Sequence, residues 1–146
     1  MAEAVGHGIA LYSPLGGGLL SAKHRDGQPD RGSVVHSEDT NQRTRIVDEL
    51  LAVANEVGAT PAQVAVAWQR AKATASSTSV VSVIGVRSTA HLEGYLGALD
   101  VTLDDSQVER LSAVSEIYRG APHDGIGGPP DLGDAERLSH YPLPIA

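Results

Sequence analysis

A glycine-rich turn follows a short apolar run near the start of the chain. The run covers residues 8–12 and stops at Ser13-Pro14, and its length together with the proline favours a buried strand over a helix. Three glycines follow at positions 16–18, and Lys23 comes shortly after them. Glycines let an anion approach main-chain N–H groups, so the turn is a candidate phosphate site. The alternative is a plain turn, because neither Walker nor Rossmann spacing is present.

A second candidate site follows a second apolar run at residues 80–84. Gly85-Val86-Arg87-Ser88 comes at the end of this run and leads into a helix. In parallel α/β folds, ligands bind at the carboxyl edge of the strands, and helix N-termini favour anions. Arg87 can hold a phosphate through two hydrogen bonds. The alternative is an exposed arginine near a helix start, although two such sites on neighbouring strands favour a ligand.

No catalytic or metal-binding pattern accompanies these two sites. The six histidines show no metal-ligand spacing, the chain has no cysteine, and no Gly-x-Ser-x-Gly motif is present. Asp104-Asp105 is a pair of carboxylates, but a capping role at a helix start explains it more simply. The residues therefore predict an anion-binding edge, no metal and no catalytic group.

The elements that must position the two sites alternate between strands and helices. Apolar spacing predicts a helix through residues 46–57 that Gly58 ends. Thr60-Pro61 with Gln63 predicts a capped helix start, and two more helices are expected to begin near Ser88 and Asp104. Residues 26–42 are polar and are expected to form a long surface loop. This βα alternation predicts an α/β fold with a parallel sheet.

A parallel sheet seldom consists of two strands, so further strands are expected to belong to the fold. The strand pair alone would leave its edges open, which predicts self-association or docking with a missing part of the sheet. We expect the side chains that lose their cover to be Ile9, Leu11, Val81 and Val83.

Composition limits the remaining classes of partner. The net charge of −7 argues against a nucleic-acid partner. No apolar run approaches the ~20 residues that span a bilayer, and the first residues lack a basic segment. A cytoplasmic protein without membrane contact is the expectation.

Four ordered segments resemble the aldo-keto reductase family. Residues 8–23 resemble its seventh-strand signature, and residues 60–68 resemble the helix before its eighth strand. Residues 83–99 resemble its final strand and helix, and residues 102–111 resemble its closing helix. The resemblance implies the C-terminal part of a (β/α)8 TIM barrel, with about two βα units and a closing helix. It implies a partial barrel at residues 1–118 and a Gly/Pro-rich irregular tail at 119–146.

The resemblance also implies NADP(H) as cofactor and assigns residues to it. The pyrophosphate would be lined by Ser13, Leu15, Gly17, Gly18, Lys23 and Arg31. The adenosine 2′-phosphate and the adenine would be surrounded by Gly85, Arg87 and His91. His91 replaces a usual Gln, and Tyr95 stands where the family commonly has an Asn. We therefore expect dinucleotide binding to be weak, salt-sensitive and better for NADPH than for NADH.

The family's catalytic Asp, Tyr, Lys and His lie on its first four strands, and no residue here corresponds to any of them. The resemblance implies that the missing part of the sheet is an N-terminal half. The family activity is NADPH-dependent reduction of an aldehyde or ketone, and we expect the chain alone to be inactive. The alternatives are a non-catalytic module that binds a phosphorylated ligand or assembles with another chain, and a truncated product without function.

Overall fold

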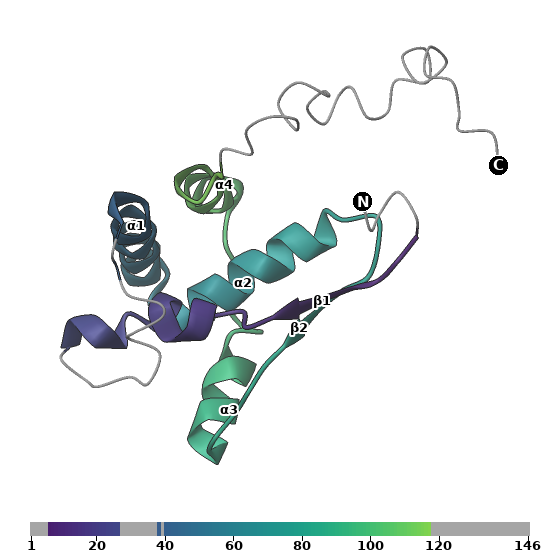
Figure 1. The fold of residues 1–146 in the computed structure, drawn as a ribbon, viewed down its shortest axis with the longest axis horizontal. Helices are drawn as coiled ribbons and strands as arrows, with labels where there is room; N and C mark the ends of the chain where they lie inside the picture. The colour runs from purple at the N-terminus through teal and green to yellow at the C-terminus, as the bar shows by residue number, and fades with distance from the viewer. Residues whose placement is uncertain (1–5, 27–37, 39, 118–146) are drawn as a thin grey trace, which may run out of the picture. The chain divides into compact units, whose positions relative to one another are not determined.

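The computed structural model describes residues 6–26, 38 and 40–117, and the chain divides into two units, Met1–Ser115 and Glu116–Ala146. The predicted irregular tail at 119–146, the middle of the predicted loop at 26–42, and Arg31 all lie outside the described residues. The account below concerns the first unit, which is an α/β arrangement with one small parallel sheet (Figure 1).

The sheet consists of two short parallel strands, β1 (Ile9–Tyr12) and β2 (Val80–Val83). Ile9 pairs with Val80 and Tyr12 pairs with Val83, so the two strands end level with each other. The crossover between them contains two short 3₁₀ segments, η2 (Gly16–Ser21) and η3 (Lys23–Asp26), followed by two α-helices. The predicted strand–helix alternation and the parallel pairing are confirmed.

The two crossover helices begin and end where their sequence signals predict. Helix α1 (Asn41–Val57) is capped by Thr40 and ends at Gly58, whose φ of +66° is the left-handed conformation that glycine adopts most readily. Helix α2 (Pro61–Thr74) has a complete capping box between Thr60 and Gln63. The end of the predicted polar loop is corrected slightly, because α1 already begins at Asn41.

Two further helices follow β2. Helix α3 (Thr89–Gly97) is capped by Ser88, and helix α4 (Asp105–Val114) is capped by Asp104, which forms a capping box with Gln107. Arg70 of α2 donates hydrogen bonds from Nη1 to the carbonyl oxygens of Ala98 and Leu99, at 2.8 and 3.0 Å. These bonds satisfy carbonyls at the end of α3, which otherwise lack a helical partner, and they tie α3 to α2.

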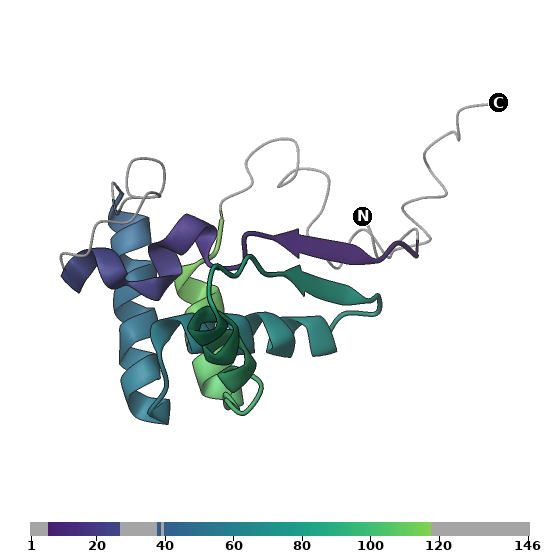
Figure 2. The ribbon, with the colours of Figure 1, turned by 90° about the horizontal axis from the view of Figure 1, so that it is seen from below.

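The buried core lies among helices. Its members come from α1, α2 and α4: Leu50, Val53, Ala54, Val64, Ala65 and Leu111. No residue of either strand belongs to this cluster. Helix α2 connects the helical core to the sheet, because it packs against α1 and α4 and also runs alongside the strand pair (Figures 1 and 2).

One face of the sheet is covered and the other is open. Ser82 bonds to α2, so Ser82 and its register partner Leu11 lie on the helix-covered face. The opposite face carries Tyr12, Val81 and Val83, which are 88%, 62% and 45% exposed. The prediction of uncovered side chains is therefore confirmed for Val81 and Val83. It is wrong for Ile9 and Leu11, which are half-buried, because the strand register places them on the same face as Ser82 and not on the face of Val81 and Val83.

Within the described part of the chain, no single helix has the length and apolar character needed to cross a membrane. Helices α1 and α2, bent by 93° at their junction, meet that test only as a pair, on length and composition.

Candidate functional site: the carboxyl edge of the strand pair

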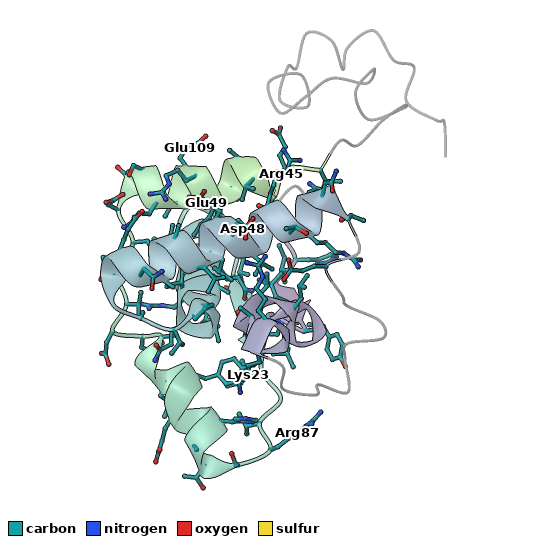
Figure 3. The ribbon with its side chains drawn as sticks, turned by 90° about the vertical axis from the view of Figure 1, so that its left-hand side faces the viewer. Lys23, Arg45, Asp48, Glu49, Arg87 and Glu109 are labelled. Carbon is teal, nitrogen blue, oxygen red and sulfur yellow. The ribbon has the colours of Figure 1, made fainter. Side chains whose placement is uncertain are left out.

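The two predicted phosphate sites leave the same edge of the sheet. Because β1 and β2 are parallel and end in register at Tyr12 and Val83, residues 13–26 and 84–88 both begin at their carboxyl ends. This edge faces the viewer in Figure 3. The topology therefore brings together two segments that lie about seventy residues apart in the sequence, at the position where α/β folds bind ligands.

The glycine turn has an unusual backbone that is held by its own hydrogen bonds. Gly16, Gly17 and Gly18 all have positive φ, and Ser13 has a φ of +55°, a conformation that non-glycine residues seldom adopt. The N–H of Gly16 donates to the carbonyl of Ser13 at 2.9 Å, and that of Gly17 donates to the Ser13 hydroxyl at 3.0 Å. The N–H of Gly18 donates to the carbonyl of Leu15 at 3.0 Å.

These bonds correct the idea that the glycine N–H groups point at a phosphate. In this conformation all three N–H groups donate hydrogen bonds inside the turn. The glycines are therefore needed for the positive φ angles of the turn. A phosphate at this end of the edge would be met first by side chains, and Lys23 is the charged one. The assignment of Ser13, Leu15, Gly17 and Gly18 to cofactor binding stays a prediction.

Lys23 lies at the start of η3, which an arginine fixes to α1. Arg25 donates from Nε and Nη2 to the two carboxylate oxygens of Glu38, at 2.7 and 2.6 Å, and from Nη1 to Asp48 at 2.7 Å. Hydrogen bonds to Glu38, and then to Asp48, raise the pKa of the Arg25 guanidinium above its ordinary value. Arg25 is thus fully used in holding η3, whereas Lys23 is exposed and has no hydrogen bond or ion pair among the described residues.

The second segment presents Arg87 at the entrance to α3. Gly85, Val86 and Arg87 are exposed, and the Ser88 hydroxyl accepts a hydrogen bond from the N–H of His91 at 3.2 Å. The cap therefore already uses the backbone donor of His91, and only the exposed imidazole remains for a ligand. Arg87, like Lys23, has no ion pair among the described residues.

Figure 3 shows Lys23 and Arg87 on the side of the molecule where α3 lies, whereas Arg45, Asp48, Glu49 and Glu109 belong to α1 and α4. On α1 and α4, by contrast, charged side chains pair with each other: Arg110 pairs with Glu49 at 2.7 Å and with Glu56 at 2.8 Å. Lys23 and Arg87, which have no ion pair with any described residue, therefore leave two positive charges on this side, an arrangement suited to a ligand with separated negative charges.

One residue that joins the two segments was missed from the sequence. Gln69 of α2 bonds to Pro14 beside the glycine turn and to Ser82 of β2. Its only sequence signal is a polar residue directly after Trp68 in a helix that is otherwise largely apolar. Within the described residues, no group of three or more His, Asp or Glu side chains is placed to hold a metal ion.

The two parallel strands and the helices of their crossover fit a fragment of an α/β barrel, a fold that binds ligands at the carboxyl ends of its strands. The model of the aldo/keto reductase family matches residues 1–116, and the chain belongs to that family. Members of this family generally use nicotinamide cofactors.

Three relatives illustrate the range of similarity. A Saccharomyces cerevisiae protein named as an aryl-alcohol dehydrogenase is 29% identical over 137 residues, which cover 89% of this chain and 88% of that protein. A second protein of the same yeast and the same naming is also 29% identical over 137 residues, but the match covers 46% of it. An aldo-keto reductase of Aspergillus calidoustus is 30% identical over 156 residues, covering the whole of this chain and 38% of that enzyme. The chain therefore spans less than half the length of the two larger relatives.

Proposed function

We propose that this chain supplies the cofactor-phosphate edge of an aldo-keto reductase and binds NADP(H) there. Lys23 would meet the pyrophosphate and Arg87 the adenosine 2′-phosphate, with Arg31 joining the pyrophosphate side. The observation that carries the proposal is a pair of exposed cations, on the two segments that follow adjacent parallel strands, that have no ion pair within the part of the chain that the structure describes. A charge-assisted hydrogen bond contributes about 1.5–3 kcal/mol, so one arginine suffices to distinguish NADPH from NADH.

Titration calorimetry at low and moderate salt tests this proposal. The parent chain is expected to bind NADPH more tightly than NADH, and more weakly as salt rises, because the contacts are ionic. Arg87→Ala is expected to remove most of that preference. Arg45→Ala is the matched control, because it removes the same charge from the exposed surface of α1 and should leave the preference intact. Equal affinity of the parent chain for the two cofactors would contradict the role given to Arg87.

We further propose that the 146-residue polypeptide does not by itself reduce carbonyls. No residue corresponds to the catalytic Asp, Tyr, Lys or His that the family resemblance implies, and loss of such groups costs several orders of magnitude in rate. The assay follows NADPH absorbance with a panel of aldehydes and ketones. Turnover near ordinary enzyme rates, about 1–10³ per second, would show that the chain has catalytic groups of its own.

The open sheet face favours a second role, in which the chain docks onto the remaining strands of a barrel. Tyr12, Val81 and Val83 form an exposed apolar face, and each strand has one edge that pairs with no described strand. Leu96 of α3 and Leu99, which follows that helix, are also more than half exposed. A further βα unit would cover an open strand edge and the exposed leucines, because its strand would extend the sheet while its helix packed beside α3.

Sedimentation of the chain mixed with the region of the larger yeast relative that the match does not cover tests the docking role. A one-to-one complex that disappears when Val81 is replaced by Asp is the expected result. The matched control is Thr102→Asp, which introduces the same charge at an exposed position. A half-buried position such as Leu51 of α1 is unsuitable as a control, because an Asp there would also disturb the helical core. A stable homo-oligomer that ignores the added region would indicate self-association instead.

A further inference from the structure

The Gln69 side chain joins the two segments of the candidate site through one amide group. Its Nε2 donates to the carbonyl oxygen of Pro14 at 2.6 Å, and its Oε1 accepts from the Ser82 hydroxyl at 3.1 Å. Both bonds are partly buried between α2 and the sheet. A carboxamide can serve as donor and acceptor at once, which an aliphatic side chain at this helix position cannot do.

The partners of Gln69 lie next to the residues that would meet the ligand. Pro14 lies between Ser13 and Leu15 in the first segment, and Ser82 comes three residues before Gly85 in the second. The strands themselves pair over only four residues each, so the backbone ladder ends before either segment begins. Gln69 therefore holds both the start of the glycine turn, at Pro14, and the carboxyl-terminal part of β2, at Ser82, to the same point on α2.

We propose that Gln69 is a positioning residue that sets the separation between the Lys23 and Arg87 sites, so that one ligand with two separated phosphate groups engages both. This inference rests on the proposed function. Two linked contacts bind more tightly than either alone because the second forms at a high effective concentration, and that gain depends on their spacing being fixed. Loosening the link should therefore weaken a two-phosphate ligand more than a one-phosphate ligand.

The test compares NADP⁺, which carries both the pyrophosphate and the 2′-phosphate, with adenosine 2′-monophosphate, which carries only the latter. Gln69→Met keeps the length of the side chain and removes both hydrogen bonds. It is expected to lower the ratio of the two association constants about tenfold, a part of the ~10²–10⁴-fold gain that linked sites provide. Gln69→Glu keeps the acceptor for Ser82 and loses the donor to Pro14, so it should lower the ratio as well.

A structural control separates positioning from a general loss of stability. Ser112→Ala removes the hydroxyl that accepts a hydrogen bond from the Trp68 indole at 3.1 Å, also on α2 but facing α4. It should lower stability without changing the ratio. A ratio that stays unchanged in Gln69→Met, or that falls equally in Ser112→Ala, overturns the inference.

Hydrogen exchange gives a readout that needs no ligand. In Gln69→Met, the amides of residues 16–18 and those of β2, which leads into the second segment, should exchange faster together, while the amides of α1 and α4 keep their parent rates. Faster exchange in only one of these two regions overturns the coupling. If the parent chain binds neither ligand, the proposed function is wrong, and the exchange result by itself decides whether Gln69 links the two segments.

Discussion

Replacing one valine in the helical core and one on the open sheet face tests whether the sheet face is uncovered in solution. Val64 of α2 is completely buried, whereas Val81 of β2 is 62% exposed. Valine-to-alanine substitution removes the same two methyl groups at both places. Any difference in the free energy of unfolding therefore reports the surroundings of the side chain.

The magnitudes follow from burial. Two buried carbon groups contribute about 1.6 kcal/mol at ~0.8 kcal/mol each, and the remaining cavity adds roughly 1 kcal/mol. The better helix propensity of alanine offsets about 0.5 kcal/mol of this loss, so Val64→Ala should lower the free energy of unfolding by about 2 kcal/mol. Val81 is less than half buried, and its loss should cost about 0.5–1 kcal/mol, including the lower strand propensity of alanine.

Urea denaturation, followed by circular dichroism and by Trp68 fluorescence, measures both values. At an m-value of about 1–2 kcal/mol per molar urea, Val64→Ala should lower the midpoint by about 1–2 M. Val81→Ala should lower it by well under half of that. Equal losses in the two variants, or a midpoint that rises with protein concentration in the parent and not in Val81→Ala, would show that the sheet face is covered.

Two further predictions concern helix ends. Gly58→Ala should destabilise the chain by about 1–2 kcal/mol in chemical denaturation, because Gly58 has a φ of +66°. An added Cβ would meet no atom within 4 Å, so this cost is conformational and not steric. Gly58→Asn should cost less, and equal costs of the two substitutions would contradict this reasoning. The pKa of Asp104 is lowered, first by the hydrogen bond from the N–H of Gln107 and next by that from Ser106, so its stabilising effect is present above the unfolded pKa of about 3.9 and is lost as the pH falls through the folded value. Thermal unfolding between pH 7 and pH 2 should therefore show a smaller decline in Asp104→Asn, which keeps a capping side chain without the titration, than in the parent chain.

The sequence alone was sufficient wherever a structure depends on neighbours three or four residues apart. The capping boxes at Thr60 and Asp104, the glycine that ends α1, and the serine that caps α3 were all predicted, because donor and acceptor lie within one helical turn. The two strands were also predicted, since an apolar run that ends at a proline or glycine is a local signal. The family followed from four such local segments in the expected order.

Only the tertiary structure decided how these segments meet. The half-buried face of the strand pair was decided by the bond between β2 and α2 and by the register of β1 with β2, about seventy residues away, and the prediction for Ile9 and Leu11 was wrong for that reason. The hydrogen bonds made by the N–H groups of the glycine turn depend on positive φ angles at Ser13 and at Gly16–Gly18, which composition does not determine. Gln69 bonds to a carbonyl 55 residues earlier and to a hydroxyl 13 residues later, and no periodicity records contacts of that kind. Hydrogen bonds within one helical turn can be predicted from residue spacing, whereas the strand register and the bonds of Gln69 form only when packing brings distant parts of the backbone together.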